Sequence, residues 1–184
     1  MKEDKNRLAE ACPAIVARHL DEMEEMPNHE FVTSSYEETV ALGREIASKL
    51  LAPVLVLLTG DLGSGKTTFT KGIISGLGAA QEEEVTSPTF TLVHVFQKPI
   101  RADSTGGSQP VKVYHADLYR IENFHDLETL GLEDALAEKA IVIIEWSERF
   151  TFRSEWPRVE IHLDHAGGDA RRIAISGLNV EKRS

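Results

Sequence analysis

The sequence is poor in the residues that build disulfides and metal cages. It has one cysteine, Cys12, which excludes an intramolecular disulfide and a zinc site made only of cysteines. Its seven histidines show no H-x-x-x-H spacing, so a structural transition-metal site is not expected. No apolar run approaches the roughly 20 residues of a membrane helix, and the N-terminus has no apolar stretch long enough for a secretory signal. These absences predict a cytoplasmic protein that does not enter a membrane.

Basic residues are also few. The chain has 20 Lys and Arg against 30 Asp and Glu, for a net charge of -10. Because affinity for nucleic acid comes largely from basic residues that neutralise phosphates, we do not expect strong unassisted binding to nucleic acid. The 184 residues, 41% of them hydrophobic, suit one domain with a real core. Its acidic surface would attract a basic surface on a protein partner.

One complete motif stands out against this background. The segment Gly60–Thr67 fits G-x-x-x-x-G-K-[ST] and directly follows the apolar run Val54–Thr59. Glycines allow positive φ, so backbone N–H groups can face phosphate oxygens, and the N-terminus of a following helix adds positive potential. Lys66 can reach the β- and γ-phosphates, and Thr67 can ligate Mg²⁺. The motif predicts a site for a nucleotide and Mg²⁺, formed by Asp61, Leu62, Gly63, Ser64, Gly65, Lys66, Thr67 and Thr68.

Two later strands end in acids. The strand 111–117 closes on Asp117, and the apolar run 140–144 closes on Glu145, which is the Walker B pattern. The Ser87-Pro88-Thr89 turn comes after the helix that follows the motif, where many P-loop proteins sense the γ-phosphate. An ordinary proline turn has the same composition, and position alone favours neither interpretation.

The remaining pattern predicts an α/β protein with the three-layer P-loop NTPase fold, a mixed and mainly parallel sheet, and an antiparallel C-terminal hairpin at 158–163 and 171–176. Ser35 and Glu38 form a capping box for a helix over 36–51. Gly131 splits an apolar helical stripe that starts at Phe124. Residues 1–28 are expected to be a flexible or loosely docked extension, 29–178 the P-loop ATPase domain with a mobile loop at 98–110, and 179–184 a tail.

Four blocks, in this order, resemble the TsaE (YjeE-type) family of bacterial ATPases over about residues 31–176. They are Gly60-Asp61-Leu62-Gly63-Ser64-Gly65-Lys66-Thr67-Thr68, Ser87-Pro88-Thr89-Phe90-Thr91-Leu92-Val93, Tyr114-His115-Ala116-Asp117-Leu118-Tyr119-Arg120 and Ile144-Glu145-Trp146. The resemblance implies ATP hydrolysis with Mg²⁺ in the making of threonylcarbamoyladenosine, a modified base of transfer RNA. It also implies docking on a TsaD–TsaB-type complex, with tRNA contacted only indirectly. Ala116 and the longer 98–110 and 1–28 segments depart from the family pattern.

The same resemblance assigns roles to single residues. Lys66, Asp117 and Glu145 would be catalytic, with Thr67 and the two acids around Mg²⁺, and Thr89 and Trp146 would lie at the nucleotide. The resemblance also favours the γ-phosphate sensor over the plain turn at Ser87-Pro88-Thr89. Chain position favours Asp117 nearer the metal and Glu145 nearer the attacking water. For Trp146, plain core packing is the alternative. Residues 33–38 are a weaker suggestion for reading the base.

Two other functions share parts of this pattern. A small-molecule kinase would have the same loop and acids, but such enzymes usually add a cluster of lid arginines, which is not visible here. A guanine-specific switch would normally carry an N-K-x-D motif, which the chain lacks. No arginine is clearly placed as a finger, and Arg120 is a candidate only because it is near Asp117. Since an arginine finger raises the hydrolysis rate by about 10³–10⁵-fold, we expect slow turnover from the isolated chain. We also expect the isolated chain to be a monomer.

Overall fold

The computed structural model describes residues 29–88, 91–98, 110–152 and 156–178. Its strands are β1 (His29–Thr33), β2 (Val54–Thr59), β3 (Val93–Lys98), β4 (Val111–Asp117), β5 (Ile141–Glu145), β6 (Arg158–His165) and β7 (Arg171–Ser176). Its helices are α2 (Tyr36–Ala47), α3 (Lys66–Gly76), α4 (Phe124–Glu128) and α5 (Leu132–Ala137), with 3-10 turns η1 (Glu82–Glu84) and η2 (Ser147–Arg149). The predicted extension 1–28, the tail 179–184 and residues 99–109 of the predicted loop lie outside the described residues.

The strands form one mixed sheet in the order β1-β7-β6-β2-β5-β4-β3. The central strands β6, β2, β5 and β4 are parallel, while β3 and the β1-β7 pair attach antiparallel at the two edges. Strands β6 and β7 form the predicted C-terminal hairpin, so the predicted fold class is confirmed. Because β2, β4, β5 and β6 are parallel, their carboxyl ends meet at one edge of the sheet, where ligands bind in open α/β sheets.

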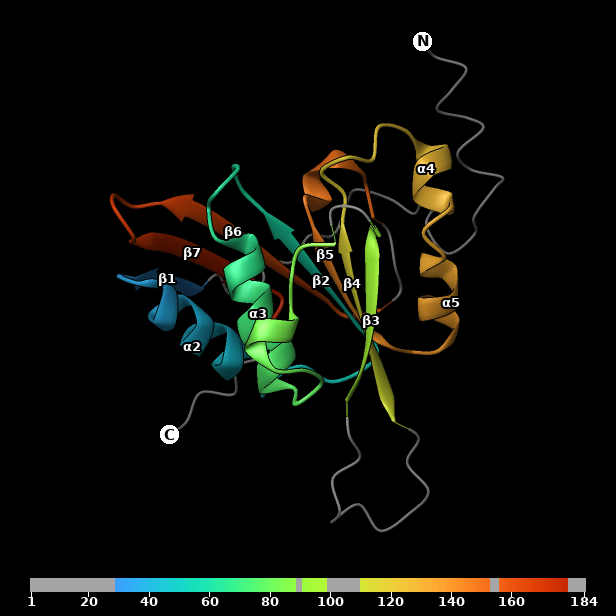
Figure 1. Cartoon of the computed structure of the whole chain (residues 1–184), viewed down its shortest axis with the longest axis horizontal. Helices are drawn as coiled ribbons and strands as arrows, with labels where there is room; N and C mark the ends of the chain where they lie inside the picture. The colour runs from blue at the N-terminus through green and yellow to red at the C-terminus, as the bar shows by residue number, and fades with distance from the viewer. Residues whose placement is uncertain (1–28, 89–90, 99–109, 153–155, 179–184) are drawn as a thin grey trace.

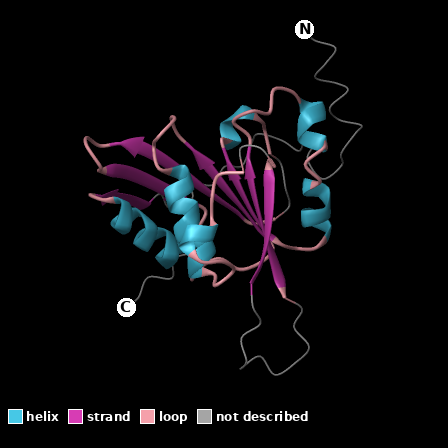
Figure 2. Cartoon of the chain, viewed as in Figure 1, coloured by secondary structure: helices cyan, strands magenta, loops and turns pink. Residues whose placement is uncertain are grey.

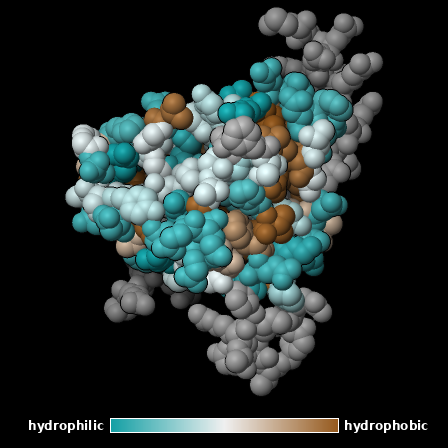
Figure 3. Space-filling model, in the orientation of Figure 1, coloured by the Kyte–Doolittle hydropathy of each residue, from teal (hydrophilic) through white to brown (hydrophobic). Residues whose placement is uncertain are grey.

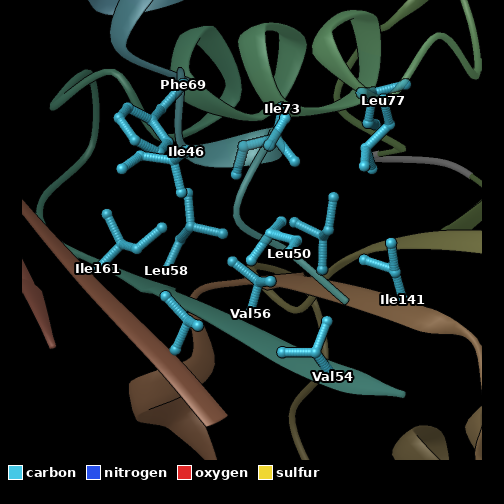
Figure 4. Packing of buried hydrophobic residues seen from close by; sticks show 14 of the residues in the cluster. Ile46, Leu50, Val54, Val56, Leu58, Phe69, Ile73, Leu77, Ile141 and Ile161 are labelled. Carbon is cyan, nitrogen blue, oxygen red and sulfur yellow. The ribbon is translucent and has the colours of Figure 1, made fainter. Parts of the chain in front are cut away.

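Helices cover both faces of the sheet and give the predicted three layers (Figures 1 and 2). Side chains of β2 alternate between two cores. Val54, Val56 and Leu58 pack under α2 and α3 with Ile73 (Figure 4). Leu55 and Leu57 belong to the second core, which includes residues of α4 and α5. This alternation on buried strands explains why β2 has a continuous apolar sequence.

Some local boundaries differ from the predicted ones, and β6 runs to His165, two residues past the predicted end. Helix α2 ends at Ala47, four residues before the predicted Leu51, because the Ser48 hydroxyl and N–H both donate to the Glu45 carbonyl and close a turn. Strand β3 starts at Val93, since Leu92 adopts φ 64° and its N–H donates to the carbonyl of Pro88. These are side-chain and turn contacts that hydrophobic periodicity does not report.

The cap of α2 also differs in detail from the predicted box. The Ser35 hydroxyl accepts from the Glu38 N–H at 3.2 Å, as predicted. The Glu38 carboxylate accepts from the backbone N–H of Ser34 at 2.7 Å, whereas a capping box would have it accept from the N–H of Ser35. Backbone N–H groups on each side of the helix start are therefore hydrogen-bonded by side chains of the expected types, a serine and a glutamate.

The surface of the described residues is mostly polar on the face shown in Figure 3. Apolar residues gather on this face around β3, an edge strand whose Val95 is 52% exposed. Among the described residues, no helix combines the length and the apolar character that crossing a membrane requires.

Candidate functional site

The loop between β2 and α3 depends on its glycines. Gly60, Gly63 and Gly65 have φ values of 129°, 77° and 101°, in the region that favours glycine. A Cβ atom at Gly60 would lie 2.2 Å from the carbonyl oxygen of Leu163. A side chain is therefore excluded at Gly60 by contact as well as by conformation. Gly65 is the N-cap of α3, so the loop leads directly into a helix N-terminus.

Lys66 is the buried cation of this loop. Only 5% of its surface is exposed, and its Nζ donates to the carbonyls of Gly60 at 2.6 Å and Asp61 at 2.8 Å. The same Nζ lies 3.7 Å from the ring centroid of Trp146. Burial lowers the pKa of Lys66, while the negative charge of Glu145 opposes that shift. The ammonium is thus held inside the loop between carbonyl oxygens and an aromatic face.

Glu145 lies beside the start of α3. It is 1% exposed, and its Oε2 accepts from the Thr67 hydroxyl at 2.7 Å. Its Oε1 lies 2.8 Å from Nε2 of His115, a fully buried residue of β4. A carboxylate only accepts, so the ring proton of His115 belongs on Nε2. His115 and Glu145 therefore form a buried pair that presents one carboxylate oxygen to Thr67.

Asp117 is the second strand-end acid, and it has different partners. It pairs with Glu145 in the β4–β5 register and is 4% exposed. Its carboxylate accepts from the Ser87 hydroxyl in a short hydrogen bond and from the Tyr119 N–H at 2.9 Å. The two acids are therefore adjacent, but Glu145 is linked to the loop and Asp117 to the turn before β3.

Comparison with known proteins identifies relatives of this chain. A family model described as "Threonylcarbamoyl adenosine biosynthesis protein TsaE" matches residues 33–173. The chain belongs to the TsaE family. The curated relatives named "tRNA threonylcarbamoyladenosine biosynthesis protein TsaE" include one from Bacillus subtilis, 32% identical over 146 residues, which are 79% of this chain and 84% of that protein. One from Haemophilus influenzae is 40% identical over 122 residues, which are 66% of this chain and 69% of that protein.

A solved structure supports the fold of this TsaE-family chain. The crystal structure of Bacillus subtilis YdiB matches with a TM-score of 0.60 and 26% sequence identity, and the match covers 85% of this chain and 89% of that one. The shared fold therefore extends over most of the chain.

Most of the predicted site residues lie together in this family member. Asp61, Leu62 and Gly63 are exposed at the outer turn of the loop, where 72% of the Leu62 surface is accessible. Thr68 is half-buried in the first turn of α3. Trp146 contacts Lys66 and also the ring of Tyr119, at 4.9 Å between centroids. Thr89 lies outside the described residues, and its role stays a prediction.

Two residues near the loop were missed from the sequence. His115 shares the strand and the side-chain parity of Asp117, so the two-residue period of β4 could have placed it on the same face. Arg171 of β7 contacts Gly63 of the loop, 108 residues away in the sequence, and no local sequence pattern predicts such a contact. The suggested base-reading segment 33–38 does begin beside it, since Thr33 pairs with Arg171.

Proposed function

We propose that this TsaE-family chain hydrolyses ATP with Mg²⁺, and that hydrolysis supports formation of threonylcarbamoyladenosine on transfer RNA. The observation that carries the proposal is the hydrogen bond between the Thr67 hydroxyl and the buried Glu145 carboxylate, beside the buried Lys66 ammonium. A glycine-rich loop, a helix N-terminus and a buried cation together suit a polyphosphate. The tRNA modification is the process for which its relatives are named.

The donors present fit the two groups. Ser64 has a fully buried hydroxyl without a hydrogen-bond partner among the described residues, which a loop closing around phosphate could engage. The described residues contain no group of three or more His, Cys, Asp or Glu side chains that could hold a metal ion. Mg²⁺ usually takes one or two protein oxygens and completes its shell with substrate phosphates and water. Thr67 and Glu145 are the residues that would hold it.

Each residue then has a distinct task. The loop backbone and the start of α3 bind the phosphates, and Lys66 offsets their negative charge. Glu145, held by His115, keeps the Thr67 hydroxyl directed at the metal position. Bound Mg²⁺ would supply charge neutralisation at the β- and γ-phosphates. Asp117 is the acid that remains to orient water, and Ser87 connects it to the turn proposed to sense the γ-phosphate. This assignment reverses the order of the two acids that chain position favours, because the loop contact belongs to Glu145.

Lys66→Ala tests the hydrolase directly. We expect a loss of about 10²-fold or more in Mg²⁺-dependent phosphate release, with weaker ATP binding. The reason is that the γ-phosphoryl group loses the buried cation that offsets its negative charge. Lys71→Ala is the matched control, since Lys71 lies on the same helix but faces Tyr36, 5.9 Å from that ring. Phosphate should be released without any added acceptor, which separates a hydrolase from a kinase. Wild-type rates and binding in Lys66→Ala would contradict the assignment.

We further propose that the chain acts within a TsaD–TsaB-type protein complex and contacts tRNA only through it. The net charge of -10 suits a protein partner better than a private tRNA site. Turnover of the isolated chain should be slow, because no arginine among the described residues is clearly placed as a finger. Arg171 contacts the loop, but its N–H groups donate to backbone carbonyls of Ala170 and Gly63. A pull-down with TsaD–TsaB at several salt concentrations, with and without ATP, tests this role. No complex in either nucleotide state would count against it.

A further inference from the structure

The phosphate loop has a second flank, opposite the acids, formed by the β6–β7 hairpin. Strand β6 runs parallel to β2 on the side away from β5, so its carboxyl end also reaches the loop. The Thr59 hydroxyl at the end of β2 lies 2.8 Å from Nδ1 of His162. A Cβ atom at Gly63 would lie 3.8 Å from the ring of His165. The hairpin is therefore in contact with the loop at several points.

Arg171 makes the most direct of these contacts. Its Nη1 donates to the carbonyls of Gly168, at 3.1 Å, and Ala170, at 2.8 Å, which fixes the guanidinium against its own hairpin turn. Its Nη2 donates to the carbonyl of Gly63 at 3.3 Å. A Cβ atom at Gly65 would lie 3.6 Å from Nε of the same side chain. One planar group thus connects the turn to the glycines of the loop.

We propose that Arg171 is a positioning residue that restrains the phosphate loop before the nucleotide binds. This inference rests on the proposed ATP-binding function of that loop. A glycine-rich segment has much conformational freedom to lose on binding, so a contact that restricts it beforehand lowers the cost of binding. The guanidinium also places a positive charge beside the loop of an acidic chain. Lysine would keep the charge but lacks the planar fork that reaches both sides.

The test compares Arg171→Ala, Arg171→Lys and Arg172→Ala by calorimetric titration with ATP and with ADP. Loss of one charge-assisted hydrogen bond predicts about threefold to tenfold weaker binding in Arg171→Ala, with kcat at saturating ATP nearly unchanged. Arg171→Lys should recover part of the affinity. Arg172 is the matched control, because it is the next residue, is exposed and projects to the other face of β7.

A second measurement separates this inference from the function on which it rests. Amide hydrogen exchange of residues 61–68 in the nucleotide-free protein should be faster in Arg171→Ala and unchanged in Arg172→Ala, at similar thermal stability. If the wild type does not bind ATP, the proposed function fails, and exchange alone decides whether Arg171 restrains the loop. If the wild type binds ATP and Arg171→Ala binds it equally well, the positioning role is overturned, whatever the exchange shows.

Discussion

Two neighbouring residues of β4 hold two glutamates on opposite faces of the sheet. His115 contacts Glu145 at 2.8 Å, and the Tyr114 hydroxyl donates to Glu138 at 2.7 Å. Each glutamate has one further side-chain partner, the Thr67 hydroxyl for Glu145 and the Lys112 ammonium for Glu138. The pairs differ in exposure, since the Glu145 side chain is 2% accessible and that of Glu138 is 39% accessible.

The difference shows that the number of hydrogen bonds does not identify a functional acid. Glu138 meets a lysine at the surface, where hydrogen bonds from Lys112 and Tyr114 lower its pKa. Such exposed pairs add little to stability because water screens them. Glu145 is buried at the carboxyl end of a central strand, and its partners are uncharged or histidine. A buried carboxylate that is hydrogen-bonded to no lysine or arginine is costly even with the charge of Lys66 nearby, which favours a ligand role for Glu145 over a purely structural one.

Exchanging each glutamate for glutamine should break the comparison most sharply. We expect Glu145→Gln to lower kcat for ATP hydrolysis by about 10²-fold or more, because an amide cannot replace a carboxylate in the proposed role of metal ligand. Glu138→Gln should leave kcat unchanged. Steady-state phosphate release for both variants, with unfolding curves as a check, makes the measurement. Equal effects of the two substitutions would remove the distinction.

The partners of the two glutamates provide the next largest effect. His115→Phe keeps the ring volume but leaves Oε1 of Glu145 buried without a donor, so we expect a stability loss of about 1–3 kcal/mol. Because the carboxylate loses its orientation, kcat should also fall by about 10–100-fold. Tyr114→Phe, one residue earlier, should leave kcat as it is. Urea unfolding and kinetics on both variants test this, and an unchanged kcat in a folded His115→Phe would show that the histidine only fills space.

The sequence predicted the parts of this site that lie on regular elements. Gly60–Thr67, Asp117 and Glu145 follow from a motif and from two strands that end in acids, and parallel strands then bring them to one edge. The hydrogen-bond partners could not be predicted in the same way. Which acid meets Thr67 depends on ångström-scale packing of β5 against α3, and Arg171 arrives from a hairpin far along the chain.

A smaller effect concerns Asp117, the acid that shares the sheet face of Glu145 but contacts Ser87. Removing either partner should reduce kcat. A double-mutant cycle of Ser87→Ala and Asp117→Asn should show a coupling of about 1 kcal/mol in the activation free energy from kcat, because the two side chains are hydrogen-bonded to each other. Ser87→Ala combined with Glu138→Gln provides the uncoupled reference. Strict additivity of Ser87→Ala and Asp117→Asn would mean that the turn and the acid act separately.

The smallest effect tests the Tyr114–Glu138 hydrogen bond through the pH dependence of stability. Burial and the hydrogen bond to Glu138 raise the pKa of Tyr114 to about 12, from an ordinary value of 10.0. The unfolded chain therefore loses this proton first, so the stabilisation is complete below pH 10 and is lost as the pH rises toward 12. Tyr114→Phe should be less stable than wild type by about 1 kcal/mol at pH 8, with a gap that narrows by pH 11. Tyr36, whose pKa is also raised to about 12 by its hydrogen bond to Glu82, is unchanged in both proteins and contributes equally to both. Urea unfolding at pH 8, 10 and 11 measures the gap, and a constant gap would mean that Tyr114 stabilises the fold by packing alone.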